Sequence, residues 1–178
     1  MNLPPAPLFF ILTGPPGSGK TSLLEALSSD VNTVPEAARR VLSEQRASGG
    51  TVTGDQDPGA FIQHMQETMD KDFETASGLS LFDRGLPDLL AFCAYYKSPD
   101  IELRAEIKRM RYQPLIFFLP AWRDIYHSDQ ERRLDFAGAA AFGDLTRQAY
   151  RQSGYVILDV PKTSLAGRRA FILDHLDV

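Results

Sequence analysis

An apolar run that breaks into a Gly/Pro-rich turn limits what this chain can fold into more than any other stretch. Residues 8–12 are apolar, and the turn after them leads into a Lys-Thr pair that can begin a helix. Gly14 to Thr21 fits the pattern G-x-x-x-x-G-K-[ST] at every fixed position. This is the pattern of a phosphate-binding loop when a strand precedes it and a helix follows it. Both conditions are met, so the sequence predicts nucleotide phosphate binding.

Each residue type in this loop has a physical reason. Backbone N–H groups that turn inward around a phosphate require positive φ and no Cβ, which suits Gly14, Gly17 and Gly19. The next helix adds free amides and the positive end of its dipole. Lys20 can reach the β- and γ-phosphates and the Thr21 hydroxyl can ligate Mg²⁺. We expect ATP to be held by Gly14, Pro15, Pro16, Gly17, Ser18, Gly19, Lys20, Thr21 and Ser22. The alternative is an ordinary Gly-Pro turn before an amphipathic helix.

The whole-chain composition limits the class of protein. The 178 residues suffice for one full core and are few for two, so one domain spanning residues 1–178 is predicted. The formal net charge of -4 gives no basic footprint that would favour nucleic acid or a membrane. The oligomeric state is left open by these observations.

The single cysteine and the N-terminal segment indicate the cellular compartment in which we expect the protein. Cys93 excludes an intrachain disulfide and a thiolate metal cluster, and its apolar helical surroundings favour a buried thiol. The N-terminus has no basic region, and its apolar run is too short for a signal core or a membrane span. We therefore expect a cytoplasmic protein with no membrane partner.

Five apolar runs alternate with helical patterns along the chain. The run between Pro114 and Pro120 is almost continuously apolar, as expected of a strand buried on both faces of a parallel sheet. A terminal helix is predicted after Thr163 as its cap, with Leu165, Ile172 and Leu176 on its inward side. The fold class predicted is a parallel α/β sandwich whose strands lie near residues 8–12, 31–34, 79–82, 114–120 and 155–160.

Two acids follow predicted strands on the edge where ligands bind in open parallel sheets. Asp83 has the position of an acid that holds Mg²⁺ directly or through water, although it could instead cap the next helix. Glu36 can accept a hydroxyl proton from an acceptor or orient a water, with Arg39 available for an anionic group of the acceptor. For Glu36 the alternative is a first-turn residue that complements the helix dipole.

A polar, arginine-rich segment at residues 122–136 is a candidate lid. An arginine on a closing flap supplies donors to the transferred phosphoryl group and excludes water. The candidates are Arg123, Arg132 and Arg133, and the alternative for the Arg132-Arg133 pair is a solvated helix face. A Gly-rich loop at residues 48–59 is either a mobile segment over the site or an idle surface loop.

Four stretches, taken in order, resemble the small AAA-like P-loop ATPase/kinase family. They are Gly14–Thr21, Val34–Arg39, Asp83–Gly85 and the Arg132-Arg133 region. That family is similar to nicotinamide riboside kinases, deoxynucleoside kinases and other nucleoside or nucleotide kinases.

The resemblance implies a P-loop three-layer sandwich with a five-stranded parallel sheet in the order 2-3-1-4-5. It also implies Mg-ATP on Lys20 and Thr21, an acceptor near Glu36, Arg39 and Arg84, and a lid carrying Arg123, Arg132 or Arg133. In deoxynucleoside kinases the Glu after the second strand is the base, and Pro35-Glu36 matches that place. The Asp-Arg-Gly motif departs from their acid-Arg-Ser, and the acceptor is not assigned.

Two hypotheses about function follow. The first is an ATP- and Mg²⁺-dependent phosphotransferase for a small nucleoside- or nucleotide-like acceptor, with Lys20, Glu36, Asp83, Arg84, Arg132 and Arg133 as the catalytic set. The second is a switch that hydrolyses ATP slowly and works through a protein partner, which the Gly-rich loop favours because such loops can order on nucleotide binding.

Overall fold

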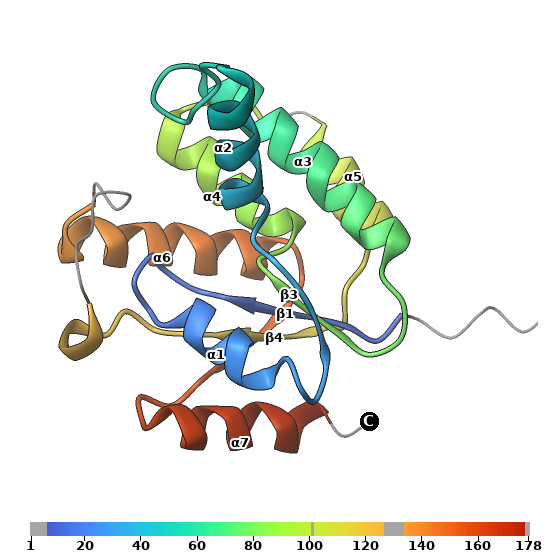
Figure 1. Ribbon diagram of the computed structural model, residues 1–178, viewed down its shortest axis with the longest axis vertical. Helices are drawn as coiled ribbons and strands as arrows, with labels where there is room; N and C mark the ends of the chain where they lie inside the picture. Colours follow the sequence, from blue (N-terminus) through green and yellow to red (C-terminus); the bar gives the residue numbers. More distant parts are fainter. Residues whose placement is uncertain (1–6, 101, 127–133, 177–178) are drawn as a thin grey trace, which may run out of the picture.

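One five-stranded parallel sheet forms the centre of the protein (Figure 1). The computed structural model describes residues 7–100, 102–126 and 134–176. The strand order β2-β3-β1-β4-β5 and the parallel sense of all four pairings confirm the predicted topology. The strands are β1 (Phe9–Thr13), β2 (Asn32–Val34), β3 (Ser80–Asp83), β4 (Leu115–Phe118) and β5 (Val156–Asp159).

Helices cover both faces of this sheet and make the two outer layers of the three-layer sandwich. Figure 1 shows α1 and α7 on one face and the other helices on the opposite face. A short 3-10 helix, η1 (Arg123–Ile125), follows β4. The α-helices are α1 (Lys20–Leu27), α2 (Ala37–Ser48), α3 (Pro58–Thr75), α4 (Leu86–Tyr96), α5 (Leu103–Arg109), α6 (Phe136–Gln152) and α7 (Leu165–Leu176).

The central strand β1 divides the core into two clusters. Because successive side chains of a strand point to opposite faces, Phe9 and Ile11 join the cluster under α2 to α6. Phe10 and Leu12 join the cluster under α1 and α7. All five residues of β1 are buried, which explains why the strand is a continuous apolar run rather than an alternating one.

The start of α7 differs from the prediction in two details. Ser164, not Thr163, caps the helix, because its Oγ accepts a hydrogen bond from the Gly167 N–H at 3.1 Å. Leu165 is 39% exposed, so its predicted inward position is wrong, whereas Ile172 and Leu176 are buried as predicted. The buried face of α7 consists of Arg168, Ile172 and Leu176, which are spaced four residues apart, and Leu165 at the first position of the helix is not part of it.

The buried position of Cys93 is confirmed, and burial raises the pKa of its thiol to about 11. None of the helices in the described ranges has both the length and the apolar character needed to cross a bilayer.

Candidate functional site at the carboxyl edge of the sheet

The predicted phosphate-binding loop joins β1 to α1, and its shape depends on glycine at three positions. Gly14, Gly17 and Gly19 have φ of 147°, 77° and 86°. A Cβ on Gly14 would also lie 2.4 Å from the Leu119 carbonyl oxygen. Other residues would be strained at these φ values, so the loop conformation requires these glycines.

Lys20 is folded into the loop that it follows. Its ammonium donates to the carbonyl oxygens of Gly14 and Pro15, at 3.0 Å each. The side chain is 7% exposed, and this burial, with repulsion from Arg84, lowers the pKa of Lys20 to about 8 against the attraction of nearby carboxylates. A buried ammonium that hydrogen-bonds only to carbonyl groups would be stabilised by a negatively charged phosphate. The next residues, Thr21 and Ser22, are exposed.

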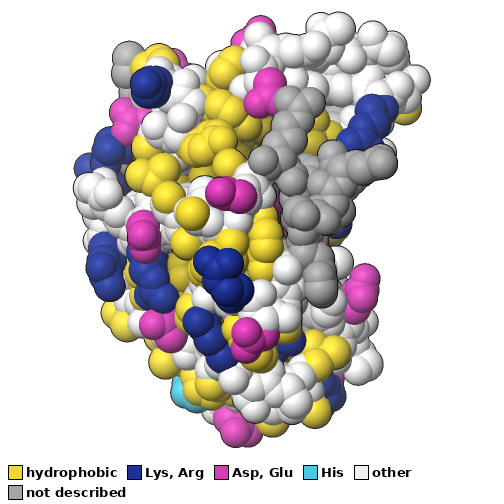
Figure 2. Space-filling view, turned by 90° about the vertical axis from the view of Figure 1, so that its left-hand side faces the viewer, with side chains coloured by type: hydrophobic (Ala, Val, Ile, Leu, Met, Phe, Trp, Pro, Cys, Tyr) yellow, Lys and Arg dark blue, Asp and Glu magenta, His cyan; other side chains and the backbone are white. Residues whose placement is uncertain are grey.

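The register of the sheet brings both strand-end acids to this loop. Asp83 is the last residue of β3 and pairs with Leu12, one residue before the end of β1. On the other side of β3, Val34 pairs with Phe82, so the chain reaches Glu36 at the same edge. Figure 2 views the molecule from this edge and shows basic side chains interspersed with acidic ones rather than one continuous basic surface.

Glu36 is held by two arginines. Its Oε1 accepts from Arg84 Nε at 2.9 Å, and its Oε2 accepts from Arg39 Nε at 3.0 Å. Burial alone would raise the pKa of Glu36, but the positive charges of Arg84, Lys20 and Arg39 outweigh it and lower the pKa to about 2. Glu36 is therefore a carboxylate at neutral pH. Such a group is better suited to accept a hydrogen bond than to remove a proton.

Arg84 is a positioning residue in this arrangement. Its Nη1 donates to Asp88 Oδ1 at 2.8 Å while its Nε donates to Glu36, and its side chain is 3% exposed. Its backbone has φ of 73°, a left-handed conformation that costs free energy in a residue with a Cβ. That Arg84 binds the acceptor stays a prediction from the sequence; its guanidinium contacts Glu36 and Asp88 here. Arg39, with a 53% exposed side chain, is the more accessible of the two arginines.

Asp88 is the buried centre of this network and was not found from the sequence. Its Oδ1 accepts from Thr13 Oγ1 at 2.7 Å as well as from Arg84. Its Oδ2 accepts from the Gly85 N–H at 3.1 Å and from the Tyr150 hydroxyl at 2.5 Å. The carboxylate thus connects β1, the β3–α4 turn and α6. The available signal was a lone acid within the apolar first turns of α4, since a charge there needs a partner.

Asp83 lies beside this network without joining it. Its Oδ1 is buried and has no hydrogen-bond partner among the described residues. Burial raises the pKa of Asp83 to about 6, although Lys20 and Arg84 act in the opposite direction. An unpaired carboxylate oxygen at the edge of the sheet that carries the phosphate-binding loop fits Mg²⁺, which keeps several waters and takes its other ligands from phosphates. The described residues contain no group of three His, Cys, Asp or Glu side chains that could hold a metal alone.

The raised pKa of Asp83 has a consequence for stability. The carboxylate is penalised in the folded state, so its cost is absent below the unfolded pKa and fully present above about pH 6. We expect Asp83→Asn to stabilise the nucleotide-free protein, and by about 1 kcal/mol more at pH 8 than at pH 5. Urea unfolding at both pH values in metal-free buffer measures this difference. Asp144→Asn, at an exposed position of α6, is the control, and a pH-independent difference at Asp83 would contradict the argument.

The described ends of the candidate lid lie close to the loop. A Cβ on Gly19 would lie 3.2 Å from Ile125 Cδ1 in η1, and one on Gly143 in α6 would lie 3.2 Å from Pro15. The guanidinium carbon of Arg123 lies 4.2 Å from the ring centroid of Phe136. Arg132 and Arg133 lie outside the described residues.

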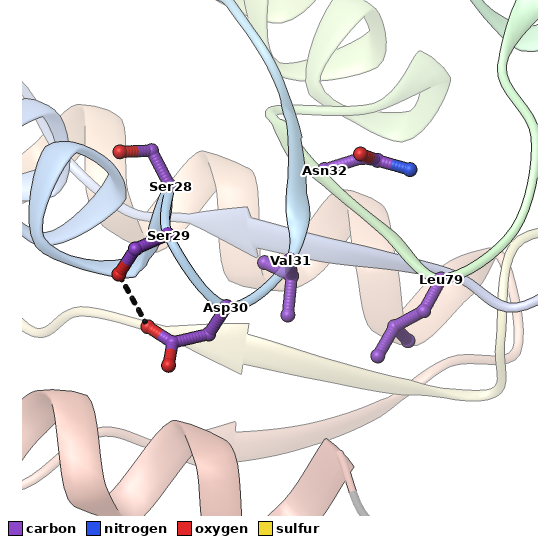
Figure 3. Close-up of a pocket in the computed structure, with 6 residues that line it drawn as sticks. All are labelled: Ser28, Ser29, Asp30, Val31, Asn32 and Leu79. Carbon is purple, nitrogen blue, oxygen red and sulfur yellow. Dashed lines mark hydrogen bonds between the residues drawn. The ribbon is translucent and has the colours of Figure 1, made fainter.

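A hollow of about 310 Å³ lies at the other end of the sheet (Figure 3). It is lined by Ser28, Ser29, Asp30, Val31, Asn32 and Leu79. These residues follow α1 or precede β2 and β3, so they lie at the amino edge, away from Lys20. In parallel sheets, ligands bind outside the carboxyl ends of the strands. This hollow is therefore not the candidate site.

Comparison with known proteins identifies the family. The profile of the AAA domain family matches residues 9–168. The chain belongs to this family. No curated protein matches the sequence significantly.

Solved kinases share this AAA domain's fold. Deoxyadenosine kinase from M. mycoides has a TM-score of 0.62 at 11% identity, covering 95% of this chain and 98% of that one. Thymidylate kinase from Candida albicans has a TM-score of 0.59 at 11% identity, with 97% and 92% covered. Shikimate kinase from Acinetobacter baumannii has a TM-score of 0.59 at 14% identity, with 97% and 92% covered. At these identities the likeness shows only that the chain shares its fold with these proteins.

Proposed function

We propose that this AAA domain protein is an ATP- and Mg²⁺-dependent phosphotransferase that acts on a small nucleoside- or nucleotide-like acceptor. The observation that carries the proposal is the gathering of Lys20, Glu36 and Asp83 at the end of a phosphate-binding loop. The charges of Glu36 and Asp83 both act on the pKa of Lys20, so the three groups are near one another. A second acid, Glu36, is held at this edge by two arginines, and in a phosphotransferase it would face the acceptor.

Each group has a proposed role. Lys20 and the loop amides bind the β- and γ-phosphates, while Thr21 and Asp83 bind Mg²⁺, which would neutralise developing charge. Glu36 orients the hydroxyl of the acceptor. This role suits its low pKa, because a loose phosphoryl-transfer transition state needs positioning more than proton removal. Arg39 binds an anionic group of the acceptor. The lid role of Arg123, Arg132 and Arg133 stays part of the proposal.

The similar structures support the class of acceptor. Two of those compared carry the names of nucleoside or nucleotide kinases, and the third is named a shikimate kinase. These names support a small-molecule acceptor, with nucleoside- and nucleotide-like molecules among the candidates.

The deciding experiment measures ADP release with and without a panel of nucleosides, nucleotides and small polyols. Turnover that rises with one acceptor, together with a phosphorylated product seen by mass spectrometry, supports transfer. Slow ATP hydrolysis that no acceptor in the panel accelerates, and that a protein partner does, would replace the proposal with the switch hypothesis.

Glu36→Gln tests the role of the second acid. The amide keeps the size of the side chain but loses the negative charge that accepts a hydrogen bond from the acceptor, so transfer should fall by about a hundredfold, the loss expected when a reacting group is misplaced. The Mg-ATP affinity should change little. Steady-state kinetics with saturating ATP measure the first quantity, and calorimetry measures the second. Glu44→Gln, on an exposed position of α2, is the matched control. An equal loss in Mg-ATP affinity would show that Glu36 serves the nucleotide instead.

A further inference from the structure

Arg168 on α7 is a buried cation, and two of its three guanidinium nitrogens have no hydrogen-bond partner among the described residues. The residue is 8% exposed. Its Nε and Nη1 are buried, and neither has a hydrogen-bond partner within the described part of the chain. Burial lowers the pKa of Arg168, and among the described residues no carboxylate offsets this effect. A buried donor without a hydrogen bond costs about 1–3 kcal/mol of folding stability, and a charged one costs more. A function that needs the group is the expected explanation for its burial.

The guanidinium lies against the phosphate-binding loop. A Cβ on Gly19 would lie 2.8 Å from Arg168 Nη1, and Gly19 is the N-cap of α1. The guanidinium carbon lies 5.6 Å from the ring centroid of Trp122, beside η1. α7 packs along α1, which brings Arg168 to the start of that helix (Figure 1). The position therefore combines unpaired donors with the positive end of a helix dipole, and both favour an anion.

The position along the loop indicates which part of the nucleotide this anion is. Lys20 donates to the carbonyl oxygens of Gly14 and Pro15 at the start of the loop, and the charges of Glu36 and Asp83 act on its pKa. Arg168 Nη1 lies instead beside Gly19 at the end of the loop, where α1 begins. The contacts of Arg168 thus lie at the opposite end of the loop from those of Lys20. We infer that Arg168 is a nucleotide-binding residue whose donors bind the α-phosphate of the nucleoside triphosphate. This inference rests on the proposed nucleotide-dependent function.

Arg168→Met tests this inference because it keeps most of the buried stem and removes only the charged donors. Charge-assisted hydrogen bonds of this kind correspond to roughly a ten- to hundredfold change in affinity. We expect the Kd values of ATP, ADP and inorganic tripolyphosphate to rise by that factor, each measured by calorimetry with the full chain. Without nucleotide the melting temperature should stay equal or rise, since an unpaired buried cation is removed. A merely structural arginine would instead lower it.

Arg169→Met is the matched control on the next residue. Arg169 is paired with Asp30 at 2.6 Å and donates to the Ala26 carbonyl, so its replacement should leave the nucleotide Kd values unchanged. An Arg168→Met protein with wild-type Kd values for all three ligands would overturn the inference. A loss for ATP and ADP with none for tripolyphosphate would assign the contact to the base or ribose and overturn the phosphate contact. Wild-type protein that binds no nucleotide would be a failure of the proposed function itself.

Discussion

Replacing Lys20 with methionine is expected to lower ATP turnover by at least a hundredfold and to leave the fold intact. The ammonium donates to the carbonyl oxygens of Gly14 and Pro15 within the loop, and removing one such electrostatic contact from an active site costs roughly a hundred- to a thousandfold in rate. The fold should survive because burial already penalises the charge, as the lowered pKa of Lys20 shows. Single-turnover kinetics and circular dichroism of the variant measure the two effects.

Lys108→Met provides the control for this substitution, because Lys108 is exposed on α5. It should keep both turnover and melting temperature. A folded Lys20→Met protein with unchanged ATP turnover would remove the basis of the nucleotide-binding assignment, and with it the proposed function.

Replacing Asp88 with asparagine is expected to give the largest loss of stability among the variants considered. The carboxylate is fully buried and accepts hydrogen bonds from four groups, so an amide leaves Arg84 with one anionic partner fewer. Breaking a buried ion pair on one side costs about 3–5 kcal/mol. For a chain of this length, 3 kcal/mol corresponds to a fall in melting temperature of about 6–12 °C.

Two further measurements make the Asp88 prediction specific. Asp144→Asn should change stability by less than about 0.5 kcal/mol because Asp144 is exposed on α6. Tyr150→Phe removes one donor to Asp88 and should cost about 1 kcal/mol, less than Asp88→Asn. If Asp88→Asn melts like the wild type, the network does not hold Arg84 in its left-handed conformation, and another cause must be sought for the φ of 73°.

The sequence alone predicted the parts of this protein that depend on short stretches of chain. The succession of strand, loop and helix around residues 9–27 was predicted correctly because its glycines, lysine and threonine lie within eight residues, and their backbone requirements are local. The strands β1, β3 and β4 were predicted because buried parallel strands are continuous apolar runs, and Phe9–Thr13 is entirely buried. The sheet order came from a family resemblance, which carries tertiary information that one chain's periodicity does not.

The tertiary structure decided which charged groups pair and which stay unpaired. The contacts of Glu36 with Arg84, of Tyr150 with Asp88 and of Thr13 with Asp88 join residues 48, 62 and 75 positions apart. No local pattern encodes such partners, because they depend on how strands and helices pack. Arg168 and Arg169 are neighbours in sequence and illustrate the same dependence on packing. Arg169 is paired with Asp30, whereas Arg168 lies beside Gly19 and its Nε and Nη1 have no hydrogen-bond partner among the described residues. The two side chains point in different directions from the helix, and the packing of α7 against α1 decides which of them meets Asp30 and which meets Gly19.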